Sequence, residues 1–381
     1  MRAFVFTDKA LAKHAGQFVW LSIDTEKEQN APFVHKYPVR AWPSLYVIDP
    51  KKEAVVLRWV GGANASQLAK LFAEATSKAK GGAPGSGAVA LARADALYGE
   101  GRYQDAAQAY REALVSLSPK SGSYARVIEA LLFAYTLLDR HADCVDLARD
   151  SLPGLRGTIS GANVAAAGLD CSLSLPSGSS GRAGNIAESQ KAVRAALDDP
   201  KLRLAADDRS AVYGLLVSER EDAKDEPGAK ALAREWAASL DAEAARVKTA
   251  EQRTALDPNR LSAYEAAGEI ARAIPMLEQS AKDFREDYNP PARLAYVYLK
   301  LGRHTEALEA NDRALALVYG PRKLRVLTVR TDIYEAMKDP AAAQRTLEDA
   351  VRFAEALPAG QRSETQIAAL KKRLEKPKPA S

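Results

Sequence analysis

The residues of this chain that could carry out redox, nucleophilic or metal chemistry are few and far apart. The only cysteines are Cys144 and Cys171, so no Cys-x-x-C pair occurs. A Gly-x-Ser-x-Gly nucleophile elbow is absent too, because the serine of the stretch 157–161 is misplaced. The histidines lack the neighbouring cysteine or acid spacing of a metal site; they are His14, His35, His141 and His304. We therefore expect no catalytic residue, no metal and no cofactor from this sequence.

A repeated helix pair dominates the chain after residue 88. Within 94–114, a helix with a small residue at Ala94 runs to a glycine turn, and a second helix carries Ala106, Tyr110 and Ala113. Small residues let two antiparallel helices approach closely, and the aromatic fills the gap to the next pair. The pattern resembles the tetratricopeptide repeat (TPR), which implies an α-solenoid whose first helices line a concave face.

The same pattern continues to the C-terminus. It is strong at 295–315, where Asn311 replaces the expected aromatic, and again at 334–350. Weaker units are predicted between these ends, at 124–152, 160–197, 207–246 and 256–284. The chain is thus predicted to hold about seven helix pairs followed by a capping helix at 362–375.

Residues spaced by three or four along the first helices should point into the groove. In the strongest units these are Asp95, Tyr98, Arg293, Tyr296, Lys300, Arg325 and Asp332. The run 321–325 and Arg330 add positive charge at one end. Because arginine pairs with carboxylates bidentately, we expect an acidic segment or a C-terminal carboxylate as the ligand. The alternative is that these are ordinary solvated helix charges.

The two cysteines are predicted to be structural. Cys144 takes the small-residue place that Ala106 and Ala307 take elsewhere, and Cys171 lies among leucines in the first helix of the next unit. Two reduced, buried thiols are the favoured interpretation, because buried cysteine packs as a small apolar residue. A disulfide is the alternative, since stacking brings these two helices together; it requires a Cα separation below roughly 7 Å.

The first 79 residues have a different order of elements. An apolar run at 18–24 is typical of a buried parallel strand, and 28–37 is a short helical connection. Trp42, Pro43 and Ser44 then precede a strand that starts at Leu45. A further strand at 54–60 and an amphipathic helix at 65–76 complete the segment.

This order resembles a thioredoxin-like domain that lacks its first strand and its Cys-x-x-C turn. The resemblance implies that Pro43 is cis and that Trp42, Pro43 and Ser44 form a surface for an extended substrate segment. It implies that 1–14 is the rest of the helix after the redox motif, and that the native start lies upstream of Met1. Without the cysteines, the domain is expected to be redox-inactive.

The predicted fold class is mostly α: a TPR-like α-solenoid preceded by a partial thioredoxin-like α/β domain. The expected boundaries are 1–79 for the partial domain, 80–87 for a Gly/Pro/Ser linker, 88–375 for the repeats and 376–381 for a disordered tail. The net charge of +5 comes from interspersed acids and bases, which argues against nucleic-acid binding. No stretch reaches the roughly 18 apolar residues of a transmembrane helix.

As a whole the chain resembles bacterial proteins in which a thioredoxin-like domain precedes TPR repeats. The predicted function is a protein-interaction scaffold that binds a partner protein or peptide through the repeat groove. One alternative is a thiol–disulfide oxidoreductase whose Cys-x-x-C lies upstream of Met1, and another is a purely structural solenoid. A cytoplasmic location fits these residues alone, whereas a signal sequence upstream would make the protein periplasmic or exported.

Overall fold

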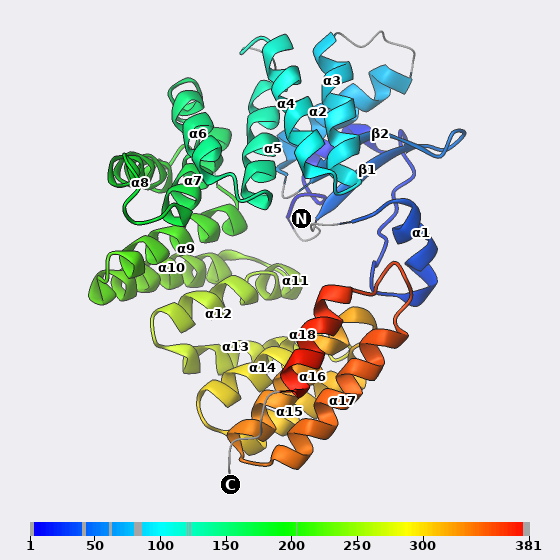
Figure 1. Ribbon diagram of the computed structural model, residues 1–381, viewed down its shortest axis with the longest axis vertical. Helices are drawn as coiled ribbons and strands as arrows, with labels where there is room; N and C mark the ends of the chain where they lie inside the picture. Colours follow the sequence, from blue (N-terminus) through cyan, green and yellow to red (C-terminus); the bar gives the residue numbers. More distant parts are fainter. Residues whose placement is uncertain are drawn as a thin grey trace. The chain divides into compact units, whose positions relative to one another are not determined.

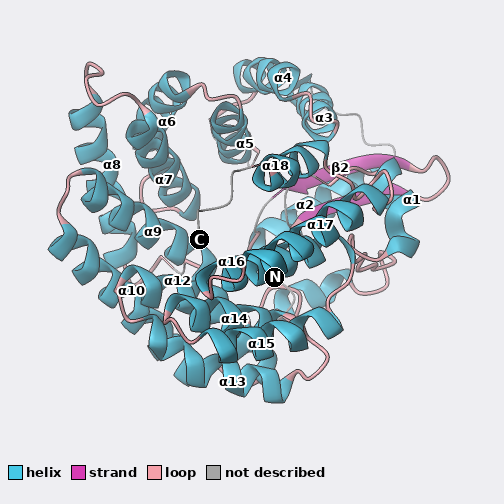
Figure 2. Ribbon diagram, turned by 60° about the horizontal axis from the view of Figure 1, so that its bottom comes forward, coloured by secondary structure: helices cyan, strands magenta, loops and turns pink. Residues whose placement is uncertain are grey.

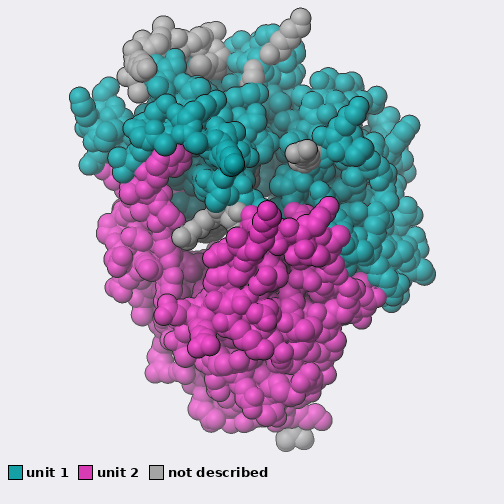
Figure 3. All heavy atoms as spheres, turned by 180° about the vertical axis from the view of Figure 1, so that it is seen from behind, with its two compact units in different colours: residues 1–19, 39–239 teal, residues 20–38, 240–381 magenta. Residues whose placement is uncertain are grey.

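The computed structural model describes residues 4–39, 43–60, 63–79, 86–119, 121, 123–202 and 204–375. These residues are mostly helical, and the strands among them form one two-stranded sheet (Figure 2). They divide into two compact units, coloured in Figure 3. The first unit is Met1–Val19 with Val39–Ser239, and the second is Trp20–Pro38 with Leu240–Ser381.

The sheet is an antiparallel hairpin in the first unit. Strand β1 (Ser44–Asp49) pairs with β2 (Ala54–Val60), and α2 (Ala65–Ala79) packs against it through Leu68, Leu71 and Phe72. Leu57 of β2 joins the same apolar cluster. These two strands and this helix are the elements predicted from the sequence at the same places, so that part of the prediction is confirmed.

The prediction of a strand at 18–24 is wrong. The residues form no strand, and the side chains of Val19 and Leu21 are 88% and 73% exposed. A buried strand needs hydrogen-bonding neighbours along its edges, and the described sheet pairs β1 only with β2. Instead of a long helix near the start, the described residues have a short 3-10 helix, η1 (Lys9–His14). Residues 20–38 lie with the second unit, where they form η2 (Glu28–Asn30) and α1 (Ala31–Lys36).

Seven antiparallel helix pairs follow in the described part of the chain, as predicted (Figure 1). A short helix, α11 (Ala250–Thr254), precedes the fifth pair, and η3 (Ile270–Arg272) and η4 (Gly320–Arg322) are brief turns. The last helix, α18 (Glu364–Leu374), is where the capping helix was expected. The pairs are α3 (Ser86–Gly99) and α4 (Tyr103–Ser116), α5 (Tyr124–Leu137) and α6 (His141–Leu155), α7 (Ile159–Ser174) and α8 (Arg182–Asp198), α9 (Ala206–Asp222) and α10 (Glu226–Arg246), α12 (Asp257–Ala266) and α13 (Ala273–Asp283), α14 (Asn289–Lys300) and α15 (His304–Leu317), and α16 (Lys323–Ala336) and α17 (Pro340–Ala356).

Six of these pairs share one turn between their two helices. The residue two positions after the end of the first helix has positive φ, and the backbone N–H that follows it donates to the carbonyl five positions before its own, at 2.7–3.0 Å. In the sixth pair, for example, Gly302 has φ +72° and the N–H of Arg303 donates to the carbonyl of Tyr298. This hydrogen bond satisfies a carbonyl at the helix end that would otherwise lack a partner. The positive-φ residues are Gly101, Asp139, Lys224, Gly268, Gly302 and Lys338.

Small residues set the spacing of the helices, as the repeat pattern predicts. Ala106 and Ala307 are fully buried at equivalent places in α4 and α15. A Cβ on Gly168 of α7 would lie 3.0 Å from the Cβ of Ala148 on α6. Asn311, which replaces the expected aromatic, is also fully buried, and its Nδ2 donates to the carbonyl of Val326 at 3.0 Å. A hydrogen bond between helices therefore takes the place of aromatic packing in the last two repeats.

The two cysteines are joined, so the favoured prediction of two free thiols is wrong and the alternative holds. Cys144 on α6 and Cys171 on α7 form a disulfide with a Cα separation of 6.2 Å, and both residues are fully buried. The helices α6 and α7 pack directly against each other, which brings the Cα atoms inside the range that a disulfide spans. The bond links the second helix of one pair to the first helix of the next.

Most of the expected linker, residues 80–85, lies outside the described residues. The expected tail, residues 376–381, lies outside them as well. Helix α3 begins at Ser86, inside the stretch expected to be linker. Trp42 is outside the described residues as well, so the peptide bond between it and Pro43 is not described.

Candidate protein-binding face of the repeats

Asp95 and Tyr98, expected in the groove of the first repeat, lie in the core. Asp95 is 6% exposed; one carboxylate oxygen accepts from Arg126 at 2.5 Å and the other accepts from the hydroxyl of Tyr110 at 2.9 Å. Tyr98 is 3% exposed and its ring centre lies 5.2 Å from that of Tyr103. Neither side chain is therefore presented to a ligand.

The ion pair of Asp95 has a structural role. Arg126 on α5 also donates to the carbonyl of Arg58 on β2 at 2.7 Å, and its guanidinium lies 5.6 Å from the ring centre of Trp59. One arginine thus joins helices α3 and α5 to the strand hairpin. The raised pKa of Arg126 follows from this setting: burial opposes the charged form, but the adjacent Asp95 carboxylate outweighs it.

In the second unit, Tyr296 and Lys300 of α14 engage an acid on the preceding first helix. The hydroxyl of Tyr296 donates to Glu265 of α12 at 2.5 Å, and the Nζ of Lys300 lies 3.5 Å from the same carboxylate. That Nζ also lies 5.3 Å from the ring centre of Tyr296. These groups line adjacent first helices, remain partly exposed and form a polar cluster across the repeat boundary.

Arg293 and Arg325 differ from the groove residues above, which have internal partners. Neither arginine makes a hydrogen bond or ion pair with any residue that the structure describes. Arg293 is half-buried on α14 and Arg325 is exposed on α16. Burial lowers the pKa of Arg293, and the like charge of Arg325 lowers it further, whereas Asp257 and Asp287 act in the opposite direction. Two guanidinium groups on successive first helices therefore retain unused donors.

Asp257, at the start of α12, is a functional candidate that sequence reasoning missed. It is fully buried; one oxygen accepts from Ser280 at 2.6 Å, and the other, Oδ1, has no partner among the described residues. Burial raises its pKa to about 6, although Ser280 and the arginines Arg293, Arg260 and Arg253 act against the rise. An aspartate at a helix start is usually an exposed first-turn acid, so the sequence carries no signal of its burial.

The remaining predicted groove residues are occupied by internal partners. Asp332 accepts from Arg373 of α18 at 2.6 Å, and Arg373 also donates to Glu335. Arg330 pairs with Asp312 of α15 and donates to the hydroxyl of Tyr334 at 3.0 Å. These charges hold neighbouring helices together, which is the ordinary structural role that the sequence left open as an alternative.

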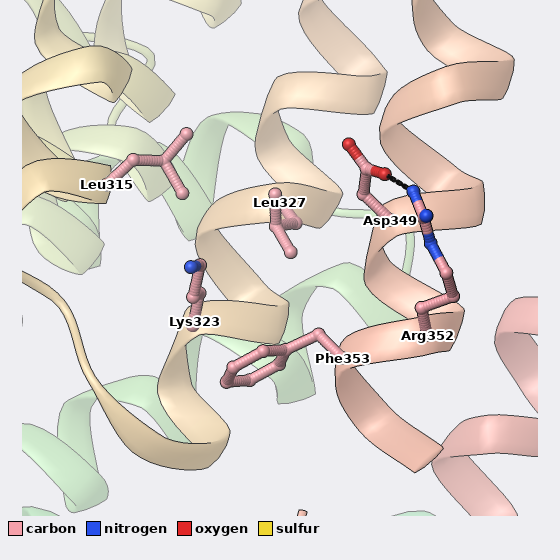
Figure 4. A pocket seen from close by; sticks show the side chains of 6 residues that line it. All are labelled: Leu315, Lys323, Leu327, Asp349, Arg352 and Phe353. Atoms are coloured by element: carbon pink, nitrogen blue, oxygen red, sulfur yellow. Dashed lines mark hydrogen bonds and ion pairs between the residues drawn. The ribbon is translucent and has the colours of Figure 1, made fainter. Parts of the chain in front are cut away.

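An open pocket of about 430 Å³ lies between α15, α16 and α17 (Figure 4). Leu315, Leu327 and Phe353 give it an apolar lining, and the Nζ of Lys323 lies 5.1 Å from the ring centre of Phe353. The ion pair of Asp349 and Arg352 lies to one side. The sequence did not indicate this pocket, because its residues come from three helices and follow no single spacing.

The surface expected around the thioredoxin-like proline is only partly described. Pro43 is exposed at the bend before β1, and Ser44 begins the strand opposite Val60. Within the described ranges, no group of three or more His, Cys, Asp or Glu side chains is arranged to hold a metal ion. None of the helices described is both long and apolar enough to cross a membrane.

Comparisons with solved structures return matches at low identity and with TM-scores below 0.5. A tetratricopeptide repeat protein from Parabacteroides merdae aligns at 10% identity and TM-score 0.47, over 76% of this chain and 99% of its own. The Cut9–Hcn1 hetero-tetramer of APC/C aligns at 15% identity and TM-score 0.36, over 80% of this chain and 59% of that one. The assembly chaperone of RpL4, Acl4, aligns at 14% identity and TM-score 0.31, over 75% and 95%.

A search of curated proteins finds no match. The family model of the tetratricopeptide repeat matches residues 288–356, which span the helices α14, α15, α16 and α17. The match covers the two pairs that the sequence pattern marked as strong near the C-terminus. Residues 288–356 are therefore similar to tetratricopeptide repeats.

Proposed function

We propose that the chain is a protein-interaction scaffold whose second unit binds an acidic segment of a partner protein. The face in question is formed by the first helices α12, α14 and α16, and we name it the arginine face after Arg293 and Arg325. The observation that carries the proposal is that these two guanidinium groups have no partner among the described residues. Tetratricopeptide repeats commonly bind extended or helical segments with such a face.

The chemistry of the arginine face suits a carboxylate. Arg293 is half-buried and feels the like charge of Arg325, so a carboxylate between them would relieve repulsion and accept hydrogen bonds from both. Asp257 keeps one negative charge close to Arg293, which limits the face to a small number of added acids. Tyr296 and Lys300 lie three and seven positions after Arg293, on the same side of α14, and extend the polar surface.

The N-terminal part of the scaffold is, in this proposal, a redox-inactive thioredoxin-like remnant. The order of β1, β2 and α2 supports it, since a hairpin followed by a packed helix is what the family has after its proline. The alternative of a thiol–disulfide oxidoreductase remains a prediction. It needs a cysteine pair near Pro43, whereas both cysteines of this sequence are bonded to each other in the repeats.

Charge reversal on the arginine face tests the proposal. Immobilised Arg293→Glu/Arg325→Glu chain and wild-type chain are exposed to a library of acidic peptides, and bound peptides are quantified. Loss of two charge-assisted contacts should weaken binding by about tenfold or more. The matched control is Arg345→Glu, an exposed arginine on the second helix α17, which should bind as the wild type does. Equal retention by the double variant and the wild type would show that the arginine face is not the site.

A further inference from the structure

The second unit contains a segment from the beginning of the chain. Residues 20–38 belong to it, although the segments on both sides belong to the first unit (Figure 3). Part of this segment contacts two loops of the last repeats: the loop between α15 and α16, which supplies Tyr319, Gly320 and Arg322, and the loop between α17 and α18, which supplies Gln361. We call these four residues the loop edge.

The loop edge contacts two acids and the backbone between them. The hydroxyl of Tyr319 donates to the carboxylate of Asp24 at 2.5 Å, and the guanidinium of Arg322 pairs with the carboxylate of Glu26. Between them, the side-chain amide of Gln361 donates to the carbonyl of Thr25 at 3.0 Å. The loop edge thus binds the carboxylates of Asp24 and Glu26 and the backbone carbonyl of Thr25 between them.

Glycine makes room for this segment. Gly320 has φ +60°, and a Cβ there would lie 2.2 Å from the carbonyl oxygen of Glu26. Any other residue at this position would collide with the bound backbone, besides the strain of a positive φ. Gly360, beside Gln361, approaches the same segment, because a Cβ added at Gly360 would lie 3.2 Å from the carbonyl oxygen of Ala31. The loop edge is therefore shaped to the backbone of a bound chain.

The contacts of residues 24–26 with the loop edge are made by polar groups, whereas Val34 and Tyr37, further along the same segment, are buried. Val19 and Leu21, just before the acids, remain 88% and 73% exposed. By contrast, the side chain of Glu26 is only 18% exposed where it meets Arg322. Asp24 also shapes its own segment, because its carboxylate accepts from the N–H of Glu26 at 3.0 Å. Because Arg322 remains 48% exposed, its ion pair is half open to water, and such pairs and single hydrogen bonds are individually weak. Residues 24–26 can therefore be exchanged at the loop edge.

We propose that the loop edge is a docking site for a partner protein with an exposed, extended segment like Asp-Thr-Glu, and that residues 24–26 are its displaceable intramolecular occupant. The site is separate from the arginine face, and the proposal does not rest on the function assigned to that face. A tethered occupant has a high effective concentration, so a partner must compete with it. Weakening the occupant should therefore open the site.

The test uses the full chain and a fluorescent peptide that copies residues 20–30. Its binding is measured by anisotropy with the wild-type chain and with the Asp24→Asn/Glu26→Gln variant. If the occupant fills the site nine times in ten, vacating it raises the apparent affinity about tenfold. Adding Arg322→Met or Gly320→Val to that variant should abolish binding, whereas adding Arg345→Met should not. Arg322→Met keeps the test informative if Gly320→Val fails to fold.

Three outcomes would overturn the proposal. The first is equal peptide affinity for the wild-type chain and the Asp24→Asn/Glu26→Gln variant. The second is equal binding by a peptide in which the acids corresponding to Asp24 and Glu26 are replaced by amides, because the loop edge would then not depend on their charge. The third is loss of binding with Arg293→Glu/Arg325→Glu but not with Arg322→Met, which would support the arginine face and exclude the loop edge.

Discussion

Replacing Asp95 by alanine separates a structural role for this acid from the groove role that its spacing predicts. The side chains of Asp95 and Arg126 are only 8% and 15% exposed, and their charged atoms are 2.5 Å apart. Removing one partner of a buried ion pair costs about 3–5 kcal/mol, because the other charge stays buried. The hydroxyl of Tyr110 loses its acceptor as well, at a cost of about 1–3 kcal/mol that overlaps with the first. We expect Asp95→Ala to lower the free energy of unfolding by about 4 kcal/mol.

The assay is urea unfolding followed by circular dichroism for Asp95→Ala, Arg126→Met and the double variant. The double variant should cost less than the sum of the single ones, since it leaves no unpaired charge. Asp105→Ala is the control: Asp105 pairs with Arg102 at 2.6 Å, but the two side chains are 52% and 57% exposed, so the loss should stay below about 1 kcal/mol. A similarly small loss for Asp95→Ala, together with weaker partner binding, would refute the structural role.

Three further predictions follow from other contacts. Reduction of the disulfide between Cys144 and Cys171 should lower the free energy of unfolding by about 3 kcal/mol for a loop of this length, measured by urea unfolding with and without reductant. If both thiols reacted with a labelling reagent in denaturant without reductant, the bond would be contradicted. Lys338→Gly should stabilise the chain by about 1 kcal/mol, because Lys338 has φ +59°, whereas Gly302→Ala at the equivalent turn should destabilise it by a similar amount. Thermal unfolding measures both changes, and a destabilising Lys338→Gly with a stabilising Gly302→Ala would disprove the shared turn. Because burial raises the pKa of Asp257 to about 6 in the folded chain, from 3.8, the native state binds the extra proton and stability should fall as pH rises from about 4 to about 6, by up to about 3 kcal/mol. Asp257→Asn should flatten that part of the pH profile, and an unchanged profile would assign the effect to other groups.

The elements of the fold could be predicted because each is encoded by neighbouring residues. Small residues at Ala106 and Ala307 and the turn at Gly302 lie within a few positions of the helices that they define. The hairpin and α2 follow from a strand–turn–strand–helix order over 44–79 in the same way. For this reason the predicted number and positions of the helix pairs agree with the structure even where the pattern is weak.

The sites could be predicted only in part, because spacing along one helix does not report what the neighbouring helices supply. Arg293 and Asp95 occupy first helices alike, yet Asp95 meets Arg126, a residue 31 positions away, and is buried. Nothing in the sequence marks Arg293 as lacking such a partner. Residues 24–26 and 319–322 are almost 300 positions apart, so no local pattern links them.

The helical repeat, its turns and the hairpin can be inferred from the sequence, since these features depend on residue size, periodicity and local backbone conformation. The three-dimensional arrangement is needed to establish which charges are paired, that Cys144 and Cys171 are bonded, and that 18–24 is not a strand. Those outcomes depend on distances between residues far apart in the chain. A carboxylate, a thiol or an apolar run has the same local sequence whether or not a partner comes within a few ångströms of it.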